Sequence, residues 1–150
     1  MTLQNLLRIG KLKEHTATAA EVQRLLAAID RNLTDAAVPS ISDETRFDVA
    51  YKAVMQCALV ATMAAGYRPA TSEPGHHQTM IQSLPLTLGV ANDVWVVLDA
   101  LRKQRNANDY TGQPIASGVV AECLTQAKAL RKLLRARLEA DHPELLKSPK

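Results

Sequence analysis

Apolar residues recur every three or four positions along most of this chain, which is the spacing of amphipathic helices. The first such line starts after Thr18 and Glu21, whose separation predicts a capping box, and it runs to Pro39. Its members are Val22, Leu25, Leu26, Ile29, Leu33 and Ala36. We therefore expect a first strong helix over this stretch.

A second apolar line follows, and alanine dominates it. Ser40 or Ser42 caps its start, and Gly66 ends it. The acidic residues Asp43 and Glu44 suit the positive end of a helix. The line consists of Phe47, Ala50, Val54, Ala58 and Ala61. Because small side chains let a neighbouring helix approach closely, we place this helix at the centre of a bundle.

The second half of the chain predicts three further helices. Residues 67–75, "YRPATSEPG", are typical of a loop, and residues 75–89 predict a shorter helix disturbed at Pro85. A long helix starts near Ala91 and stops in the turn "TGQP" at residues 111–114. The last helix starts near Ile115 and ends before Pro143. Residues 1–16 and 143–150 predict loosely structured ends.

Composition agrees with a helical protein. Hydrophobic residues make up 47% of the 150 residues and aromatic residues only 3%, so alanine, leucine and valine must fill the core. Such side chains pack best between closely approaching helices, which excludes a β-sandwich. We predict one all-α domain over residues 1–150, an antiparallel up-and-down bundle of four to five helices.

The cysteines and the apolar segments indicate in which cellular compartment the protein is expected. Cys57 and Cys123 lie in apolar helical surroundings without metal-ligand spacing, so we expect buried free thiols and a reducing compartment. The first residues lack the pattern of a secretory signal. No segment is expected to be long and apolar enough to cross a bilayer. These features predict a cytoplasmic protein without a membrane partner.

The third long helix changes character towards its end. Its apolar line joins Val94, Leu98 and Leu101, and further steps of four lead to Arg105 and Asp109, with Asn106 and Tyr110 as the adjacent pair. Placing a guanidinium in line with buried apolar side chains costs free energy of folding unless the charge is paired. Either Asp109 neutralises Arg105, or the seam opens into a cleft that holds an anion.

An ordinary helix end explains the same residues. Arg102, Lys103 and Arg105 would then complement the negative end of the helix dipole, and Asp109 would begin the turn. The formal net charge of +3 and the isoelectric point of about 9.0 favour an anionic partner only mildly.

Three segments together resemble the HEPN superfamily over residues 42–138. They are "SDETRFDVAYKAVMQCALVATMAAGYRP", "GHHQTMIQSL" and "VLDALRKQRNANDY", and the last carries the Arg105–Asn106 pair typical of that superfamily. HEPN proteins are small helical bundles that occur as RNases, as toxins paired with small nucleotidyltransferases, and as nucleotide- or RNA-binding modules. The resemblance implies a homodimer formed through the face that bears Arg105 and Asn106.

The chain departs from the HEPN nuclease pattern at one position. In nuclease members a histidine follows the arginine after four to six intervening residues, whereas here Tyr110 stands at that spacing. Tyrosine, with an ordinary pKa near 10, is a poor base at neutral pH. Arg105, Asn106 and Tyr110 would still suit phosphate and base contacts. In some HEPN toxins a partner nucleotidyltransferase modifies a nearby tyrosine with AMP, a role that Tyr110 would take here.

His76 and His77 are the other candidates for chemistry. Neighbouring residues on a helix point about 100° apart, and no third ligand stands at helical spacing, so we expect no metal site. One histidine packing near the loop and the other exposed is the ordinary interpretation. The alternative is that one of them reaches Arg105 and supplies the missing titrating group.

Three other features have both ordinary and functional interpretations. Arg46 and Tyr51 either pack at a helix start or face the Arg105 cleft. Trp95 indicates a core or dimer contact. The basic side of the last helix indicates a solvated face or a surface that steers RNA, and it comprises Lys128, Arg131, Lys132, Arg135 and Arg137.

The sequence leaves three hypotheses of function open. The first is a nucleotide- or RNA-binding HEPN protein of a toxin–antitoxin or defence type, in which Arg105 and Asn106 contact phosphate and Tyr110 contacts base or ribose. Arg102, Asp109, His76 and His77 are further candidates for ligand contacts there. The second is an active metal-independent RNase that recruits a histidine from elsewhere. The third is a helical dimeric interaction module in which Arg105 and Asp109 form an ion pair. No motif for a cofactor is present, and none is expected.

Overall fold

The computed structural model describes residues 2–72 and 75–147 of the chain. Among them are six α-helices, a short 3₁₀ helix and a two-stranded sheet. The α-helices are α1 (Leu3–Arg8), α2 (Ala19–Ala36), α3 (Asp43–Ala64), α4 (His76–Thr87), α5 (Asn92–Thr111) and α6 (Ser117–Asp141). The strands are β1 (Leu12–Glu14) and β2 (Tyr67–Pro69), and the 3₁₀ helix η1 is Pro143–Leu146. The predicted all-α bundle is confirmed.

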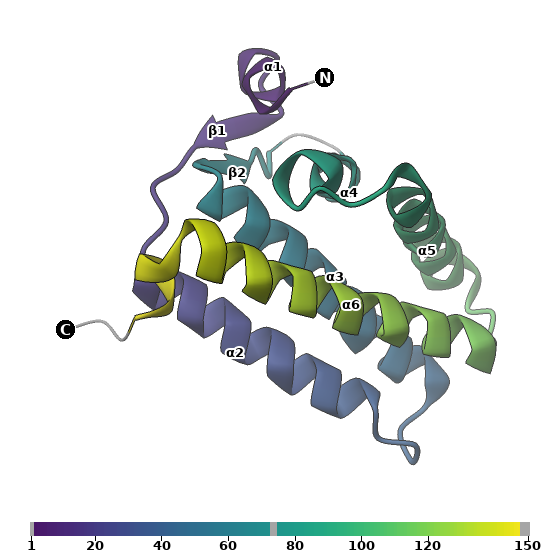
Figure 1. Cartoon of the computed structure of the whole chain (residues 1–150). Helices are drawn as coiled ribbons and strands as arrows, with labels where there is room; N and C mark the ends of the chain where they lie inside the picture. The colour runs from purple at the N-terminus through teal and green to yellow at the C-terminus, as the bar shows by residue number, and fades with distance from the viewer. Residues whose placement is uncertain (1, 73–74, 148–150) are drawn as a thin grey trace.

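Helix α3 lies at the centre of the bundle, as the alanine pattern predicts (Figure 1). It contacts α2, α6, α4, α5 and β2. Its small residues Ala50, Ala53, Ala58 and Ala61 are at most 4% exposed, so neighbouring helices pack directly on its backbone. The core around them is made mostly of aliphatic side chains, and Phe47 is its largest fully buried member.

The helices do not alternate in direction throughout. Helices α2 and α3 are antiparallel, since Arg46 near the start of α3 donates to the carbonyl of Ala36 at the end of α2. Helices α3 and α6 run in the same direction, and their C-terminal ends share a hollow lined by Ala61, Ala64 and Leu138. The parallel pair arises because α4 and α5 fill the connection between α3 and α6 (Figure 1).

Several helix ends follow the predicted chemistry. Thr18 and Glu21 form the capping box of α2, and the Ser42 side chain caps α3 by accepting from the Thr45 backbone N–H. Gly112 ends α5 with φ of 68°, a left-handed conformation that glycine adopts without strain. Helix α4 continues past Pro85 to Thr87, so the predicted disturbance does not end it.

The prediction of a loosely structured N-terminus is wrong for the described part of residues 1–16. Helix α1 and strand β1 form there, and β1 pairs antiparallel with β2 inside the predicted loop. Leu6 is 5% exposed and Leu12 is 1% exposed, so this segment buries apolar side chains of its own. The C-terminal segment likewise forms η1, with Leu145 buried. Residues 73–74 of the predicted loop and residues 148–150 of the predicted frayed tail lie outside the described residues.

Two further expectations concern apolar side chains. Cys57 and Cys123 are buried free thiols as predicted, and burial raises the pKa of each to about 12. Trp95 packs partly buried against the core.

The expectation that no segment could cross a bilayer by length and composition is wrong for one helix. The 22-residue α3 passes that test with a mean hydropathy of 1.2 over its most apolar stretch. However, 67% of that stretch is buried inside the bundle, and the central helix of a folded domain meets the same criteria.

The close approach to α3 makes a testable prediction for stability. We expect Ala58→Leu to lower the free energy of unfolding by about 1–3 kcal/mol, because the fully buried Ala58 leaves no room for three more carbons. Urea denaturation followed by circular dichroism measures the change. Ala129→Leu on the exposed side of α6 is the matched control and should change stability by less than about 0.5 kcal/mol. Equal effects in the two variants would contradict the tight packing of α3.

Candidate functional site

Arg105 lies where α5 crosses the first half of α3. Its side chain is half-buried, and its guanidinium carbon lies 5.1 Å from the centroid of the Tyr51 ring, within the range of a cation–π contact. Among the described residues it makes no ion pair with any carboxylate. The guanidinium thus lies over the aromatic face of Tyr51, with no carboxylate of the described residues at ion-pair distance.

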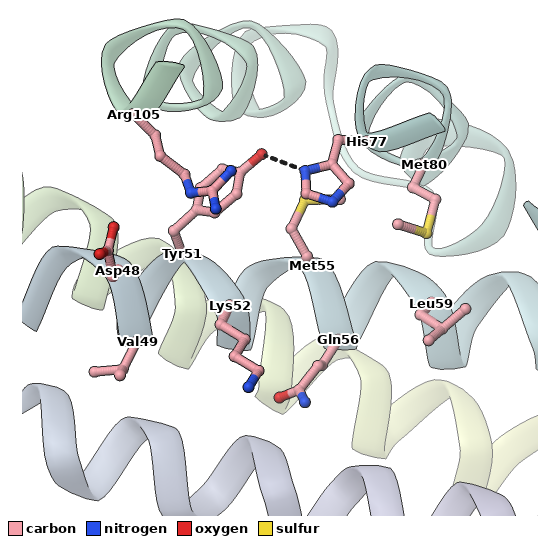
Figure 2. Close-up of a pocket in the computed structure, with 10 residues that line it drawn as sticks. All are labelled: Asp48, Val49, Tyr51, Lys52, Met55, Gln56, Leu59, His77, Met80 and Arg105. Atoms are coloured by element: carbon pink, nitrogen blue, oxygen red, sulfur yellow. Dashed lines mark hydrogen bonds between the residues drawn. The ribbon is translucent and has the colours of Figure 1, made fainter. Parts of the chain in front are cut away.

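A cavity of about 520 Å³ opens beside this contact, between α3, α4 and α5 (Figure 2). Its apolar lining comes from Val49, Met55, Leu59 and Met80. Its polar lining comes from Asp48, Tyr51, Lys52, Gln56, His77 and Arg105. A mainly apolar wall with a few convergent polar groups is typical of small-ligand sites.

Tyr51 connects the two sides of the cavity. The residue is 2% exposed, and its hydroxyl lies 3.3 Å from Nδ1 of His77 on α4 (Figure 2). Burial raises the pKa of Tyr51 to about 12, although the positive charges of Arg105 and Arg102 oppose the shift. Tyr51 therefore stays protonated and neutral at physiological pH.

His77 is surrounded by positive charge. Burial lowers its pKa, and His76, Arg105 and Arg102 lower it further by electrostatic repulsion. The ring of His76 lies edge-on to that of His77, with centroids 4.7 Å apart. His77 is therefore predominantly neutral at pH 7 in the free protein.

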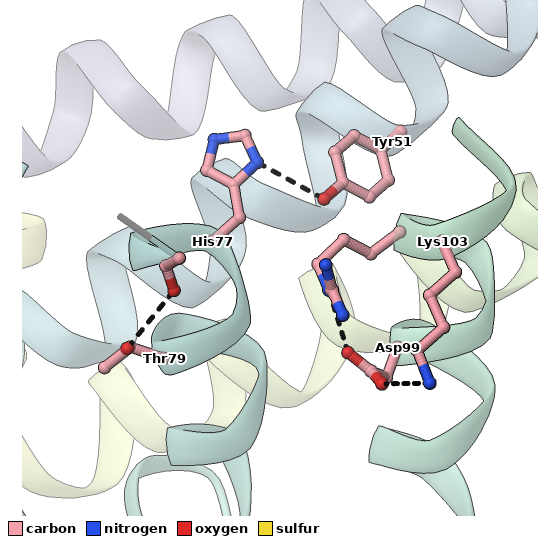
Figure 3. A network of polar contacts seen from close by, with 7 residues as sticks. Tyr51, His77, Thr79, Asp99 and Lys103 are labelled. Atoms are coloured by element: carbon pink, nitrogen blue, oxygen red, sulfur yellow. Dashed lines mark hydrogen bonds and ion pairs between the residues drawn. The ribbon is translucent and has the colours of Figure 1, made fainter. Parts of the chain in front are cut away.

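Arg102, one helical turn before Arg105, is held in a different way. Its Nε donates to the buried Asp99 carboxylate at 2.8 Å, and Lys103 Nζ lies 3.4 Å from the other oxygen of Asp99 (Figure 3). Although burial opposes ionisation, hydrogen bonding and charge from Arg102 and Lys103 keep the pKa of Asp99 below its ordinary value. Asp99, Arg102 and Lys103 all lie on α5, so these ion pairs stabilise the helix internally, one turn before Arg105.

Two smaller hollows adjoin the cavity. One, of about 260 Å³, is lined by Arg105 together with Asp48, Asn108 and Asp109. Burial and the nearby Asp109 raise the pKa of Asp48, with Arg105 opposing. The other, of about 200 Å³, is lined by His76, His77, Gln78, Arg102 and Asn106.

The structure thus separates the residues that the sequence groups together. Arg105 lines the main cavity, Asn106 lines the hollow on the α4 side, and Asp109 lines the hollow on the other side without an ion pair to Arg105. Tyr110 is 93% exposed and lines none of these three spaces. His77 does reach the Arg105 cavity, which was one of the alternatives open from the sequence.

Comparison with known proteins does not assign the chain to a family. No family model, curated protein or solved structure matches the chain. The HEPN resemblance therefore stays a prediction, and the site is interpreted from its own geometry.

Sequence reasoning did not find the polar residues of α3 that line the cavity. Asp48, Lys52 and Gln56 follow one another at steps of four on an otherwise apolar helix, which places them on one face. That polar stripe on a central helix was the available signal. The buried Asp99, three residues before Arg102, was likewise missed as its partner.

The remaining candidates take ordinary positions. Arg46 bonds the Ala36 carbonyl and lies 3.5 Å from Asp43, so it packs at the helix start while Tyr51 faces the cavity. On α6, Arg131 pairs with Asp30 of α2, and Arg135 and Arg137 pair with acidic residues one turn later. In the described residues, no group of three or more histidine, cysteine, aspartate or glutamate side chains could hold a metal ion.

The Asp99–Arg102 pair makes a prediction for stability and its pH dependence. Asp99→Asn should lower the free energy of unfolding by about 1–3 kcal/mol at pH 7, because a charge-assisted bond at a buried site is weakened. A carboxyl whose pKa is lowered on folding contributes stability above its unfolded pKa of about 3.9. The difference between variant and wild type should therefore shrink as pH falls through the still lower folded pKa.

Urea denaturation at pH 7 and at pH 3 measures both effects. Asp30→Asn is the control, because Asp30 pairs with Arg131 between α2 and α6 but its side chain is 56% exposed, and surface pairs contribute at most about 1 kcal/mol. A loss for Asp99→Asn no larger than that for Asp30→Asn would show that the buried Asp99 pair stabilises the fold no more than an exposed pair.

Proposed function

We propose that this chain is a HEPN-like nucleotide- or RNA-binding protein in which Arg105 contacts a phosphate at the cavity between α3, α4 and α5. The main support for the proposal is that the half-buried guanidinium of Arg105 lies over the Tyr51 ring, 5.1 Å from its centroid, without an ion pair among the described residues. A guanidinium held by its face keeps its edge donors available, and a phosphate satisfies two of them at once.

The other residues of the cavity support a nucleotide as the ligand. Lys52 supplies a second positive charge, and the apolar side chains of Met55, Leu59 and Met80 can enclose the face of a base. The volume of about 520 Å³ lies within the range of small-ligand sites, roughly 300–1,000 Å³. A longer RNA would continue into the hollow lined by Arg102 and Asn106.

The wider biological setting is proposed from the HEPN resemblance alone. It comprises a cytoplasmic homodimer with two Arg105 sites, a toxin–antitoxin or defence role, and a small nucleotidyltransferase as partner. Tyr110 would be open to modification by such a partner, since its side chain is 93% exposed.

Removing the guanidinium tests the binding proposal directly. Arg105→Ala should weaken binding of a fluorescein-labelled single-stranded RNA of about eight nucleotides by roughly 10- to 100-fold, the effect of losing a charge-assisted contact. Fluorescence anisotropy at several salt concentrations measures it. The plot of log affinity against log salt should become less steep by about one unit, the change expected when one phosphate contact is lost.

Arg24→Ala provides the matched control for this experiment. Arg24 is an exposed arginine on α2, away from the cavity lining, so its loss removes the same charge without touching the site. Equal weakening by the two substitutions would indicate diffuse charge attraction and would overturn the assignment of Arg105.

A second candidate function is metal-independent RNA cleavage, and one observation favours it. His77 lines the same cavity as Arg105, so a titrating group stands near the position of the proposed phosphate. A histidine there could remove the 2′-hydroxyl proton or protonate the leaving oxygen while Arg105 stabilises the phosphate charge.

Cleavage assays separate this candidate from binding alone. If the chain is an RNase, labelled RNA should be cut, and His77→Gln should lower the rate by at least roughly 100-fold because general acid–base catalysis is lost. His142→Gln at the end of α6 is the control. RNA that stays intact at protein concentrations that saturate binding would exclude the RNase hypothesis for that RNA.

A further inference from the structure

Tyr51 makes two contacts that belong to different helices. Its ring face lies under the Arg105 guanidinium of α5, and its hydroxyl meets Nδ1 of His77 on α4 (Figure 2). The same side chain, 2% exposed on the central helix, therefore fixes both of the groups that face the cavity from α4 and α5.

The hydrogen bond between Tyr51 and His77 has a preferred direction. The buried hydroxyl of Tyr51 has a proton to donate, and among the described residues His77 is its only hydrogen-bond partner. If His77 Nδ1 carried a proton and donated instead, the hydroxyl proton would be buried without an acceptor, which is unfavourable. The hydroxyl therefore donates to Nδ1.

This direction decides the tautomer of the imidazole. A neutral histidine that accepts at Nδ1 carries its proton at Nε2. Figure 2 shows the other ring nitrogen of His77 turned toward the side of the cavity lined by Met55 and Met80. The group presented to a ligand is thus an N–H donor.

The charged surroundings favour the neutral ring in the free protein. His76 faces it from α4 and Arg102 and Arg105 from α5, while Asp99 is already paired with Arg102 and Lys103. From α3, Asp48 and Lys52 line the cavity with opposite charges.

We infer that Tyr51 is a positioning residue that holds His77 as the Nε2–H tautomer, so that His77 and Arg105 together present donors to an acceptor-rich anionic ligand. The inference rests on the proposed binding function and deepens it. It assigns His77 a role in recognition that needs no proton transfer. A phosphate with its adjoining ester or sugar oxygens carries acceptors of the required kind.

The tautomer can be observed directly. Two-bond ¹H–¹⁵N correlation spectra of the wild-type chain at pH 7.5 should show His77 protonated at Nε2 and not at Nδ1. Tyr51→Phe removes only the hydroxyl, so the Arg105 contact with the ring is kept and the Nδ1–H form should become populated. A wild-type His77 protonated at Nδ1, or an unchanged tautomer in Tyr51→Phe, would overturn the inference.

Binding measurements test the consequence for the ligand. With the labelled RNA used for Arg105, His77→Ala should weaken binding by roughly tenfold, as expected for loss of one hydrogen bond to a charged acceptor. Tyr51→Phe should weaken it less, because only the fraction of His77 that becomes Nδ1–H loses its donor. His77→Gln places an amide N–H close to the position of Nε2 and should bind within about threefold of wild type. Thermal unfolding of each variant separates misfolding from loss of the donor.

The outcomes distinguish the two proposals. RNA binding that requires Arg105 but is unchanged in Tyr51→Phe and His77→Ala would overturn the role of His77 and leave the binding function standing. Absence of binding by the wild type would overturn the binding function, while the tautomer spectra would still report on the Tyr51 contact. Loss of binding in His77→Gln equal to that in His77→Ala would contradict a donor role.

Discussion

The close packing of neighbouring helices on α3 is the constraint on which the rest of the structure depends. Ala50, Ala53, Ala58 and Ala61 leave almost no side-chain bulk, so α3 is enclosed over most of its length. Its polar residues Asp48 and Lys52 are exposed and line the cavity beside the Tyr51–Arg105 contact. A site built on an enclosed central helix has side chains whose positions are set by packing.

Arg102 and Arg105 lie one helical turn apart on α5 and have different kinds of partner. Arg102 is paired with the buried Asp99 of the same helix. Arg105 receives the ring of Tyr51 in place of a carboxylate. A carboxylate would occupy the edge donors of the guanidinium, whereas an aromatic face leaves them free for a ligand. Arg102 is thus paired within its own helix, whereas Arg105 has no carboxylate within ion-pair distance among the described residues and keeps donors for a ligand.

The features predicted correctly from the sequence depend on residues that lie close together in the chain. The capping box at Thr18, the cap at Ser42, the end of α5 at Gly112 and the central place of α3 all follow from neighbouring residues or from one repeating pattern. The pairing of β1 with β2 did not follow, because each strand has three residues and the partner lies more than fifty positions away. Proximity between His77 and Arg105 was one alternative among several, since it depends on how α4 and α5 both pack on α3.

The Tyr51 hydroxyl also bears on the choice between binding and cleavage. A general base needs a lone pair that faces the substrate proton. In His77 the lone pair of Nδ1 is engaged by the hydroxyl, and the nitrogen turned to the cavity carries a proton. The contact that brings His77 into the Arg105 cavity therefore also withholds it from acting as a base, unless a ligand displaces Tyr51. For this reason we place nucleotide or RNA binding before RNA cleavage among the functions proposed for this chain.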